Sequence, residues 1–231
     1  MSSFFQKYFL KPLFYGNFKK GISFAFMGFK HYFSKDEDKR AKFIFNLIAP
    51  VYYLIDKATN KNYKEMAALL NNQIPLKGKD VLDVGCGTGS WITSLANYKL
   101  KNATGSDFSQ RMILQASENN KQINCVLQKD NSLNVFPDKS FHLVTATFVL
   151  HGMKSEKRYE LLLEMKRLAK DYVVIHDFYK GSSPMVSLLE FLERSDYINF
   201  KKCFKTEMSQ MFSETFIVEG ENGNALYVGR L

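Results

Sequence analysis

The chain has 231 residues, a formal net charge of +9 and an aromatic content of 15%. This length suits one α/β domain plus an N-terminal extension, and it is enough to bury a full hydrophobic core. Three cysteines stand far apart without a C-x-x-C pair, which argues against disulfides or a zinc site and predicts a metal-free protein of the reducing cytoplasm. No apolar run reaches the roughly 18–20 residues of a membrane span, and we expect no signal peptide.

The first 33 residues contain twelve aromatic side chains and five lysines but no acidic residue. This composition is typical of an element that lies on a membrane surface, with rings at the acyl boundary and lysines near anionic headgroups. It also suits a nucleic-acid patch, in which bases stack on rings and lysines meet phosphates. A third alternative is a helical cap that buries its rings against the core or in a homo-oligomer interface. We therefore expect a cytoplasmic protein, peripheral at the membrane in the first case, with nucleic acid the less favoured partner.

Residues 1–77 are predicted to form a helical extension or cap, and residues 78–231 the main domain. Short apolar runs and amphipathic patterns alternate in the main domain, which predicts a parallel sheet with right-handed crossovers. The expected strands cover residues 81–84, 103–108, 123–127, 141–150 and 172–175. The expected helices carry Trp91 to Ala96, begin after the N-caps Ser109 and Ser155, and begin again at Ser183-Pro184. Residues 214–219 and 225–231 flank a Gly/Asn-rich turn and predict a closing antiparallel hairpin.

A glycine-rich motif, DVGCGTG, follows the first predicted strand at residues 83–89 and opens the first helix. Its glycines permit a tight turn and let a ligand approach the backbone. Ligands of open α/β sheets bind at the carboxyl ends of the strands, where the strand order reverses. Asp107 ends the second strand, where a carboxylate can accept hydrogen bonds from ribose hydroxyls, and Asp130 follows the third, where it can accept from an adenine amino group. The G-x-G-x-G spacing differs from the G-x-G-x-x-G of dinucleotide binders.

At these residues the chain resembles the class I S-adenosylmethionine-dependent methyltransferases. VLDVGCGTG is similar to their first motif, GSDFS to their second, and QKDNSLNVFPDKSFHLV to the stretch spanning their third and fourth strands. The resemblance covers about residues 78–231. It implies a doubly wound α/β fold with a mostly parallel seven-stranded sheet and a C-terminal antiparallel hairpin. It also implies S-adenosylmethionine as the cofactor, with in-line methyl transfer that depends on proximity and orientation.

The resemblance also implies a set of cofactor contacts. The cofactor-binding residues would be Asp83, Gly85, Cys86, Gly87, Asp107, Phe108, Met112, Asp130, Asn131 and Thr147. The glycine loop would flank the methionine moiety, Asp107 would hold the ribose, and Asp130 with Asn131 would face the adenine. Phe108 and Met112 either pack on the adenine ring or belong to the core. For the two aspartates the alternative is a turn or helix-cap carboxylate.

Two residues are candidates for a catalytic role. His151 follows the fourth predicted strand, where the family places substrate-facing groups, and a histidine is a suitable base for a hydroxyl or an acidic carbon. Its alternative is a spacer between strand and helix. Residues 43–56, FIFNLIAPVYYLID, resemble the N-terminal helix F-x-x-I-A-x-x-Y-D of quinone-biosynthesis and related small-molecule methyltransferases. Tyr52 matches that pattern and would close over the cofactor or pack between helices, whereas Tyr53 replaces the aspartate.

The end of the fourth predicted strand lacks the Pro-Pro-aromatic signature of amino-directed DNA methyltransferases. The chain also has no Pro-Cys nucleophile for cytosine C5 chemistry and no acidic hairpin like that of protein-arginine methyltransferases. We therefore predict an S-adenosylmethionine-dependent methyltransferase that acts on a small, lipophilic acceptor. An RNA methyltransferase, favoured by the net charge, and a cofactor-binding protein without catalysis are the two alternatives.

Overall fold

The computed structural model of the chain describes residues 59–128, 132–181, 195–221 and 223–231. The strands are β1 (Asp80–Val84), β2 (Asn102–Asp107), β3 (Asn124–Leu127), β4 (Phe141–Thr147), β5 (Ala169–Phe178), β6 (Glu214–Glu219) and β7 (Asn224–Arg230). The helices cover residues 59–73 and then α5 (Ser90–Ala96), α6 (Gln110–Asn119), α7 (Ser155–Leu168) and α9 (Tyr197–Met211), with a 3₁₀ turn, η2 (Leu150–Gly152), after β4.

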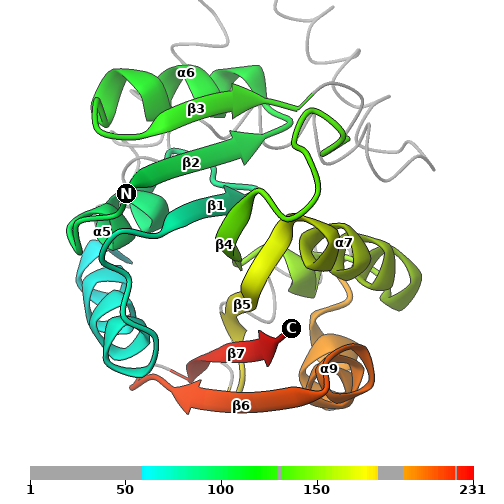
Figure 1. Cartoon of the computed structure of the whole chain (residues 1–231). Helices are drawn as coiled ribbons and strands as arrows, with labels where there is room; N and C mark the ends of the chain where they lie inside the picture. The colour runs from blue at the N-terminus through cyan, green and yellow to red at the C-terminus, as the bar shows by residue number, and fades with distance from the viewer. Residues whose placement is uncertain (1–58, 129–131, 182–194, 222) are drawn as a thin grey trace, which may run out of the picture. The chain divides into compact units, whose positions relative to one another are not determined.

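The seven strands form one sheet in the order β3-β2-β1-β4-β5-β7-β6 (Figure 1). Strands β1 to β5 pair in parallel, whereas β7 pairs antiparallel with both β5 and β6. The order reverses at β1, which lies between β2 and β4, so the carboxyl end of β1 is the expected ligand position. The predicted doubly wound, mostly parallel sheet with a closing hairpin is confirmed.

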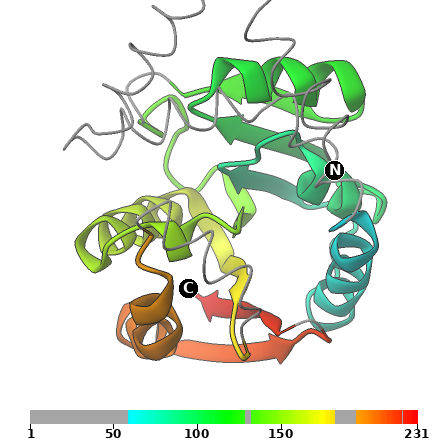
Figure 2. The same ribbon diagram turned by 180° about the vertical axis from the view of Figure 1, so that it is seen from behind.

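Helices cover both faces of the sheet (Figures 1 and 2). The helix over residues 59–73, α5 and α6 pack on one face, and α7 and α9 pack on the other. The alternation of side chains along β7 divides the core accordingly: Ala225 and Tyr227 join the α7/α9 side, and Leu226 and Val228 join the α5 side. The sheet is therefore buried on both faces, which explains why its strands read as continuous apolar runs.

The helix over residues 59–73 belongs to the core of the sheet domain. Its side chains Tyr63, Met66, Ala67 and Leu70 are buried and recur at helical spacing. They join the same hydrophobic cluster as Trp91 of α5, and the rings of Tyr63 and Trp91 lie 6.1 Å apart. This helix and the sheet lie in one compact unit, Ala58–Leu231.

The limits of β4, α7 and β5 differ from the prediction. Strand β4 ends at Thr147 and not at residue 150, because Phe148 has a positive φ of 51° that ends the extended backbone. Lys154 is the N-cap of α7, whereas Ser155, the predicted N-cap, is the first helical residue. Strand β5 is longer than predicted at both ends, since β7 continues its pairing as far as Phe178.

A fully buried arginine joins α7 to α9. Arg158 donates to both carboxylate oxygens of Glu207, at 2.9 and 2.7 Å, and to Asp196 Oδ2 at 2.8 Å. It also donates to the carbonyl oxygen of Met153, in the chain between η2 and α7. These bonds satisfy the guanidinium, which is necessary because an unpaired buried charge is strongly destabilising. Arg158 therefore anchors the segment that follows η2.

Within the described ranges, no helix is long and apolar enough to cross a membrane. The same part of the chain contains no group of three or more metal-ligating side chains that could hold a metal ion. The predicted helix start at Ser183-Pro184 and the aromatic segment 1–33 lie outside the described residues.

Candidate active site

The glycine loop turns sharply between β1 and α5. Gly85, Gly87 and Gly89 all have positive φ angles, of 70°, 53° and 84°, which side chains other than glycine rarely adopt. The backbone N–H groups of Gly85 and Cys86 donate to the carbonyl oxygen of Ser106 in β2, at 2.8 and 3.0 Å. A Cβ atom at Gly85 would lie only 2.7 Å from Val149 Cγ2. The loop therefore packs directly against the turn that follows β4.

Asp107 sits at the end of β2 and holds the neighbouring loops. Its Oδ2 accepts from the N–H of Gly87 at 3.0 Å, and its Oδ1 accepts from the N–H of Ser109 at 2.7 Å. Ser109 caps α6 as predicted, because its hydroxyl accepts from the N–H of Met112. Burial raises the pKa of Asp107 to about 6, while the backbone hydrogen bonds favour its ionised form. Each carboxylate oxygen has two lone pairs, so Asp107 can still accept from a ligand.

Four buried polar atoms without a hydrogen-bond partner in the described structure lie near the carboxyl ends of β1, β4 and β5. These atoms are Asp83 Oδ2, Thr147 Oγ1, Trp91 Nε1 and His176 Nδ1. The other carboxylate oxygen of Asp83 accepts from Thr145 Oγ1 at 2.9 Å, and Thr147 pairs with His176 across β4 and β5. Unsatisfied buried groups are rare in native proteins and mark positions where a ligand or ordered water completes the structure.

Burial controls the charge of these groups. Burial raises the pKa of Asp83 to about 8, the hydrogen bond from Thr145 opposes that shift, and the charge of Asp107 adds to it. Burial lowers the pKa of His176 to about 4, so this ring is neutral at physiological pH. A positively charged ligand group beside Asp83 would favour its ionised form and satisfy Oδ2. The carboxyl end of β1 is therefore suited to a cationic group.

His151 lies in η2, directly after the turn that touches the glycine loop. Its Nδ1 is 2.8 Å from Asp177 Oδ1, and its backbone N–H donates to Asp177 Oδ2 at 3.2 Å. Asp177 is fully buried at the end of β5, whereas the His151 side chain keeps 10% of its surface exposed. The rings of Phe178, Phe148 and Tyr197 lie 4.8, 6.4 and 6.4 Å from the imidazole. One carboxylate thus holds the histidine, and these three rings, here called the aromatic wall, surround it.

The predicted site residues fall into three groups. Asp83, Gly85, Cys86, Gly87, Asp107 and Thr147 lie at the carboxyl ends of β1, β2 and β4, and His151 follows β4. Met112 is buried and Phe108 is half-buried on the chain that leads from β2 into α6. Tyr52, Asp130 and Asn131 lie outside the described residues. Burial also raises the pKa of the Cys86 thiol well above its usual value, so this cysteine is no reactive thiolate.

The sequence marks His176-Asp177 as a second, less favoured rim position, but it does not predict that Asp177 contacts His151 or that Phe148 belongs to this site. Asp177 stands next to a histidine at the end of a strand, but nothing local indicates that it faces His151, 26 residues earlier. Phe148 reads as one more apolar residue of β4, although its N–H donates to the carbonyl oxygen of His176 and its φ is positive. Both contacts depend on the pairing of β4 with β5.

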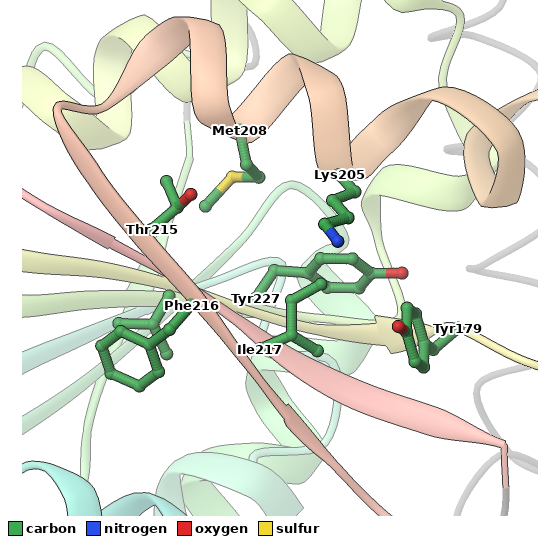
Figure 3. Close-up of a pocket in the computed structure, with 8 residues that line it drawn as sticks. Tyr179, Lys205, Met208, Thr215, Phe216, Ile217 and Tyr227 are labelled. Carbon is green, nitrogen blue, oxygen red and sulfur yellow. The ribbon is translucent and has the colours of Figure 1, made fainter.

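A separate pocket of about 200 Å³ lies between α9 and the closing hairpin (Figure 3). Lys205 and Met208 of α9 and Thr215 and Ile217 of β6 are among its lining residues. Tyr227 also lines it, and its hydroxyl donates to the carbonyl oxygen of Phe178 at 2.8 Å. None of the predicted site residues lines this pocket.

Residues 81–172 match a family model described as a methyltransferase domain. This segment is a methyltransferase domain. A demethylmenaquinone methyltransferase from Listeria welshimeri serovar 6b is 31% identical over 149 residues, which cover 59% of this chain and 61% of that protein. The chain thus matches about three fifths of the length of this curated relative. The predicted resemblance to the class I S-adenosylmethionine-dependent methyltransferases is confirmed.

Two solved structures share the fold of this domain. Magnesium protoporphyrin IX methyltransferase from Synechocystis PCC 6803, crystallised with bound S-adenosylhomocysteine, is 13% identical with a TM-score of 0.56 and covers 100% of this chain and 99% of its own. A candidate O-methyltransferase from Nostoc punctiforme PCC 73102 is 18% identical with a TM-score of 0.65, covering 81% of this chain and 60% of its own. At these identities the likeness concerns the fold.

Proposed function

We propose that this chain binds S-adenosylmethionine and transfers its methyl group to a small, lipophilic acceptor by in-line displacement. The observation that carries the proposal is the contact between Gly85 and Val149, which puts the glycine loop against the turn that bears His151. A cofactor held at the loop and an acceptor held at that turn would lie side by side. Alignment of two reactants in this way supplies most of the rate of such a reaction.

The residues present fit this cofactor. Gly85 and Gly87 hold the loop in a tight turn with positive φ angles. Asp107 can accept from ribose hydroxyls, and the unpartnered Asp83 Oδ2 suits an ammonium group. Met112, Phe108, Asp130 and Asn131 would surround the adenine. When bound, S-adenosylmethionine supplies a methyl group on a positively charged sulfur. The protein's own part is to fix the position of that group and to exclude water from it.

The acceptor class follows from the relatives and from the aromatic wall. The Listeria relative is named for demethylmenaquinone and the Synechocystis protein for magnesium protoporphyrin IX, which are both small molecules with large apolar parts. Phe148, Phe178 and Tyr197 surround His151 and would face such an acceptor. His151 would accept a proton from a hydroxyl or acidic carbon during transfer. Tyr52 would close over the two ligands.

Calorimetry tests the cofactor. Titration with S-adenosylhomocysteine should give binding, and titration with NAD should give none. Asp107→Asn should weaken binding by about 1.5–3 kcal/mol, the range for a hydrogen bond to a charged group. Asp138→Asn, on a side chain that is 74% exposed and pairs with Arg167, is the matched control and should bind as the unmodified chain does. Equal affinities in Asp107→Asn and Asp138→Asn would remove Asp107 from the site.

Labelled cofactor tests the acceptor. The protein is incubated with methyl-labelled S-adenosylmethionine and fractionated cell extract, and we expect label in an organic-soluble fraction. Label in RNA, together with RNA affinity that falls steeply with salt, would favour an RNA methyltransferase instead. Cofactor binding without transfer to any fraction would favour a non-catalytic binding protein. Each result selects one of the three functions.

We also propose that residues 1–33 bring the enzyme to a membrane that holds its acceptor. The proposal rests on the twelve aromatic residues and five lysines of this segment and on the lipophilic acceptor class. The full chain should sediment with anionic vesicles and be released by salt, while a chain that starts at Ser34 should stay in the supernatant and still bind S-adenosylhomocysteine. Failure of the shortened chain to fold would assign these rings to the core instead.

A further inference from the structure

We infer that Asp177 is a positioning residue that fixes His151 in the Nδ1–H tautomer and turns its Nε2 atom into the proton acceptor of the site. The inference rests on the proposed function, because it concerns how the proposed base acts. It adds a residue to the site from the neighbouring strand, since Asp177 lies at the end of β5 and His151 follows β4.

The hydrogen bonds of Asp177 determine where the imidazole proton lies. Asp177 accepts from the backbone N–H of Phe178 at 2.8 Å and from that of His151 at 3.2 Å. The third contact is the 2.8 Å approach of His151 Nδ1 to Asp177 Oδ1. An ionised carboxylate only accepts, so in that contact Nδ1 must carry the proton. The neutral ring then has its lone pair on Nε2, the nitrogen that points away from the carboxylate.

The same contacts fix the orientation of the ring. The carboxylate holds both the backbone and the side chain of His151, so η2 and the imidazole move together. Phe178 packs against the ring edge-on, with centroids 4.8 Å apart and planes at 78°. A base contributes to catalysis only when its accepting atom is within reach of the proton it removes, so a fixed ring is an advantage.

The neighbouring histidine has no such arrangement. His176 is fully buried, its Nε2 faces the side-chain oxygen of Asn224 at 3.3 Å, and burial lowers its pKa to about 4. Trp91 and Phe148 lie 5.0 and 4.9 Å from it, ring to ring. Of the two histidines at this edge of the sheet, His151 alone combines partial exposure with a carboxylate partner.

Backbone strain points to the same turn. Phe148 adopts a φ of 51°, which is unfavourable for a bulky side chain. Strain of this kind is stored where it positions functional groups. Here it ends β4 and starts the turn that directs His151 toward Asp177, while the Phe148 N–H keeps the turn bonded to His176 of β5.

Nitrogen NMR on histidine-labelled protein tests the tautomer directly and needs no acceptor. At a pH where the ring is neutral, the two-bond ¹H–¹⁵N pattern of His151 should be that of the Nδ1–H form. In Asp177→Asn this population should fall, because one orientation of the amide offers an N–H to Nδ1. Asp171→Asn, at the other end of β5 where Asp171 pairs with Lys79, is the matched control and should leave the pattern unchanged. An Nε2–H pattern in the unmodified protein would overturn the inference.

Kinetics with demethylmenaquinol, the reduced form of the acceptor named for the Listeria relative, separates positioning from stability. Asp177→Asn should lower kcat about 10-fold, which is less than the roughly 10²–10⁴-fold loss when a general base is removed, because His151 itself remains; KM and the affinity for S-adenosylhomocysteine should not change. The double variant Asp177→Asn/His151→Gln should be no slower than His151→Gln, because Asp177 acts through His151. Additive losses would show a structural role instead. Absence of S-adenosylhomocysteine binding would refute the proposed function while leaving the tautomer result to judge this inference.

Discussion

Alanine at Gly85 is the sharpest test of how the glycine loop and the turn after β4 fit together. Gly85 has a φ of 70°, and a Cβ placed there would lie 2.7, 3.5 and 3.7 Å from the three side-chain carbons of Val149. The first distance is well below any normal contact between carbon atoms. Two penalties therefore apply to Gly85→Ala, one from the backbone conformation and one from the contact with Val149.

Each penalty has its own magnitude. A left-handed conformation costs an alanine about 1–2 kcal/mol, and insertion of a methyl group into a packed site costs about 1–3 kcal/mol. Gly85→Ala should thus lower the free energy of unfolding by about 2–5 kcal/mol. Gly78→Ala is the matched control, because Gly78 has a φ of 75° but nothing within 4 Å of its Cβ position. The free energy of unfolding of Gly78→Ala should fall only by the conformational cost of about 1–2 kcal/mol.

Urea denaturation of both variants measures these losses, and a cycle with Val149→Ala isolates the contact. The double variant Gly85→Ala/Val149→Ala should be more stable than the sum of the single effects predicts, because the shortened side chain removes the clash. Affinity for S-adenosylhomocysteine should fall in Gly85→Ala and recover in part in the double variant. If Gly85→Ala and Gly78→Ala lose the same free energy, the loop does not pack on Val149 as described.

Two further predictions concern buried charge. Asp83 has a folded pKa of about 8, above the usual 3.8. Its contribution to the free energy of unfolding is therefore fully present below pH 4 and is lost as the pH rises to about 8. Asp83→Asn should remove this part of the pH dependence, as measured by urea denaturation without ligand. A flat difference between the two proteins from pH 4 to 8 would contradict the raised pKa. Arg158→Met should cost about 3 kcal/mol, since it strands two partly buried carboxylates, whereas the more exposed Arg167→Met should cost under about 1 kcal/mol. Equal melting temperatures of the two arginine variants would refute this reasoning.

The sequence predicted those parts of the fold that local patterns encode. The glycine loop and the first three strands were recognisable because apolar runs alternate with helix caps and positive-φ glycines. Ser109 is an example: its side chain caps α6, as a serine before a helix usually does. The closing hairpin was recognisable because a Gly/Asn-rich turn joins two runs of strand-forming residues. Each of these signals lies within about ten residues of chain.

The misread elements depend on partners far away in the sequence. Phe148, Val149 and Leu150 read as a continuation of β4 because all three are apolar. In the structure Phe148 packs on the α5 side of the sheet and Val149 on the α7/α9 side. Successive side chains on opposite faces are what a continuing strand would also show. The positive φ of Phe148 and its bond to His176 end the strand, and neither can be seen from residues 141–150 alone. Arg158 likewise reads as a solvated helix residue until α9 supplies Asp196 and Glu207.

The difference between local and distant signals also separates the cofactor-binding residues from the proposed catalytic residues. Binding of a nucleoside cofactor uses a loop and strand-end carboxylates, each close to a glycine or a strand that the sequence marks. A base needs one carboxylate to hold one ring, and here Asp177 and His151 come from the ends of adjacent strands, 26 residues apart. Because β4 and β5 pair in parallel, their carboxyl ends meet at the edge where the glycine loop also lies. The parallel sheet therefore brings the proposed base, its proposed positioning carboxylate and the glycine loop together without any motif that joins them in the sequence.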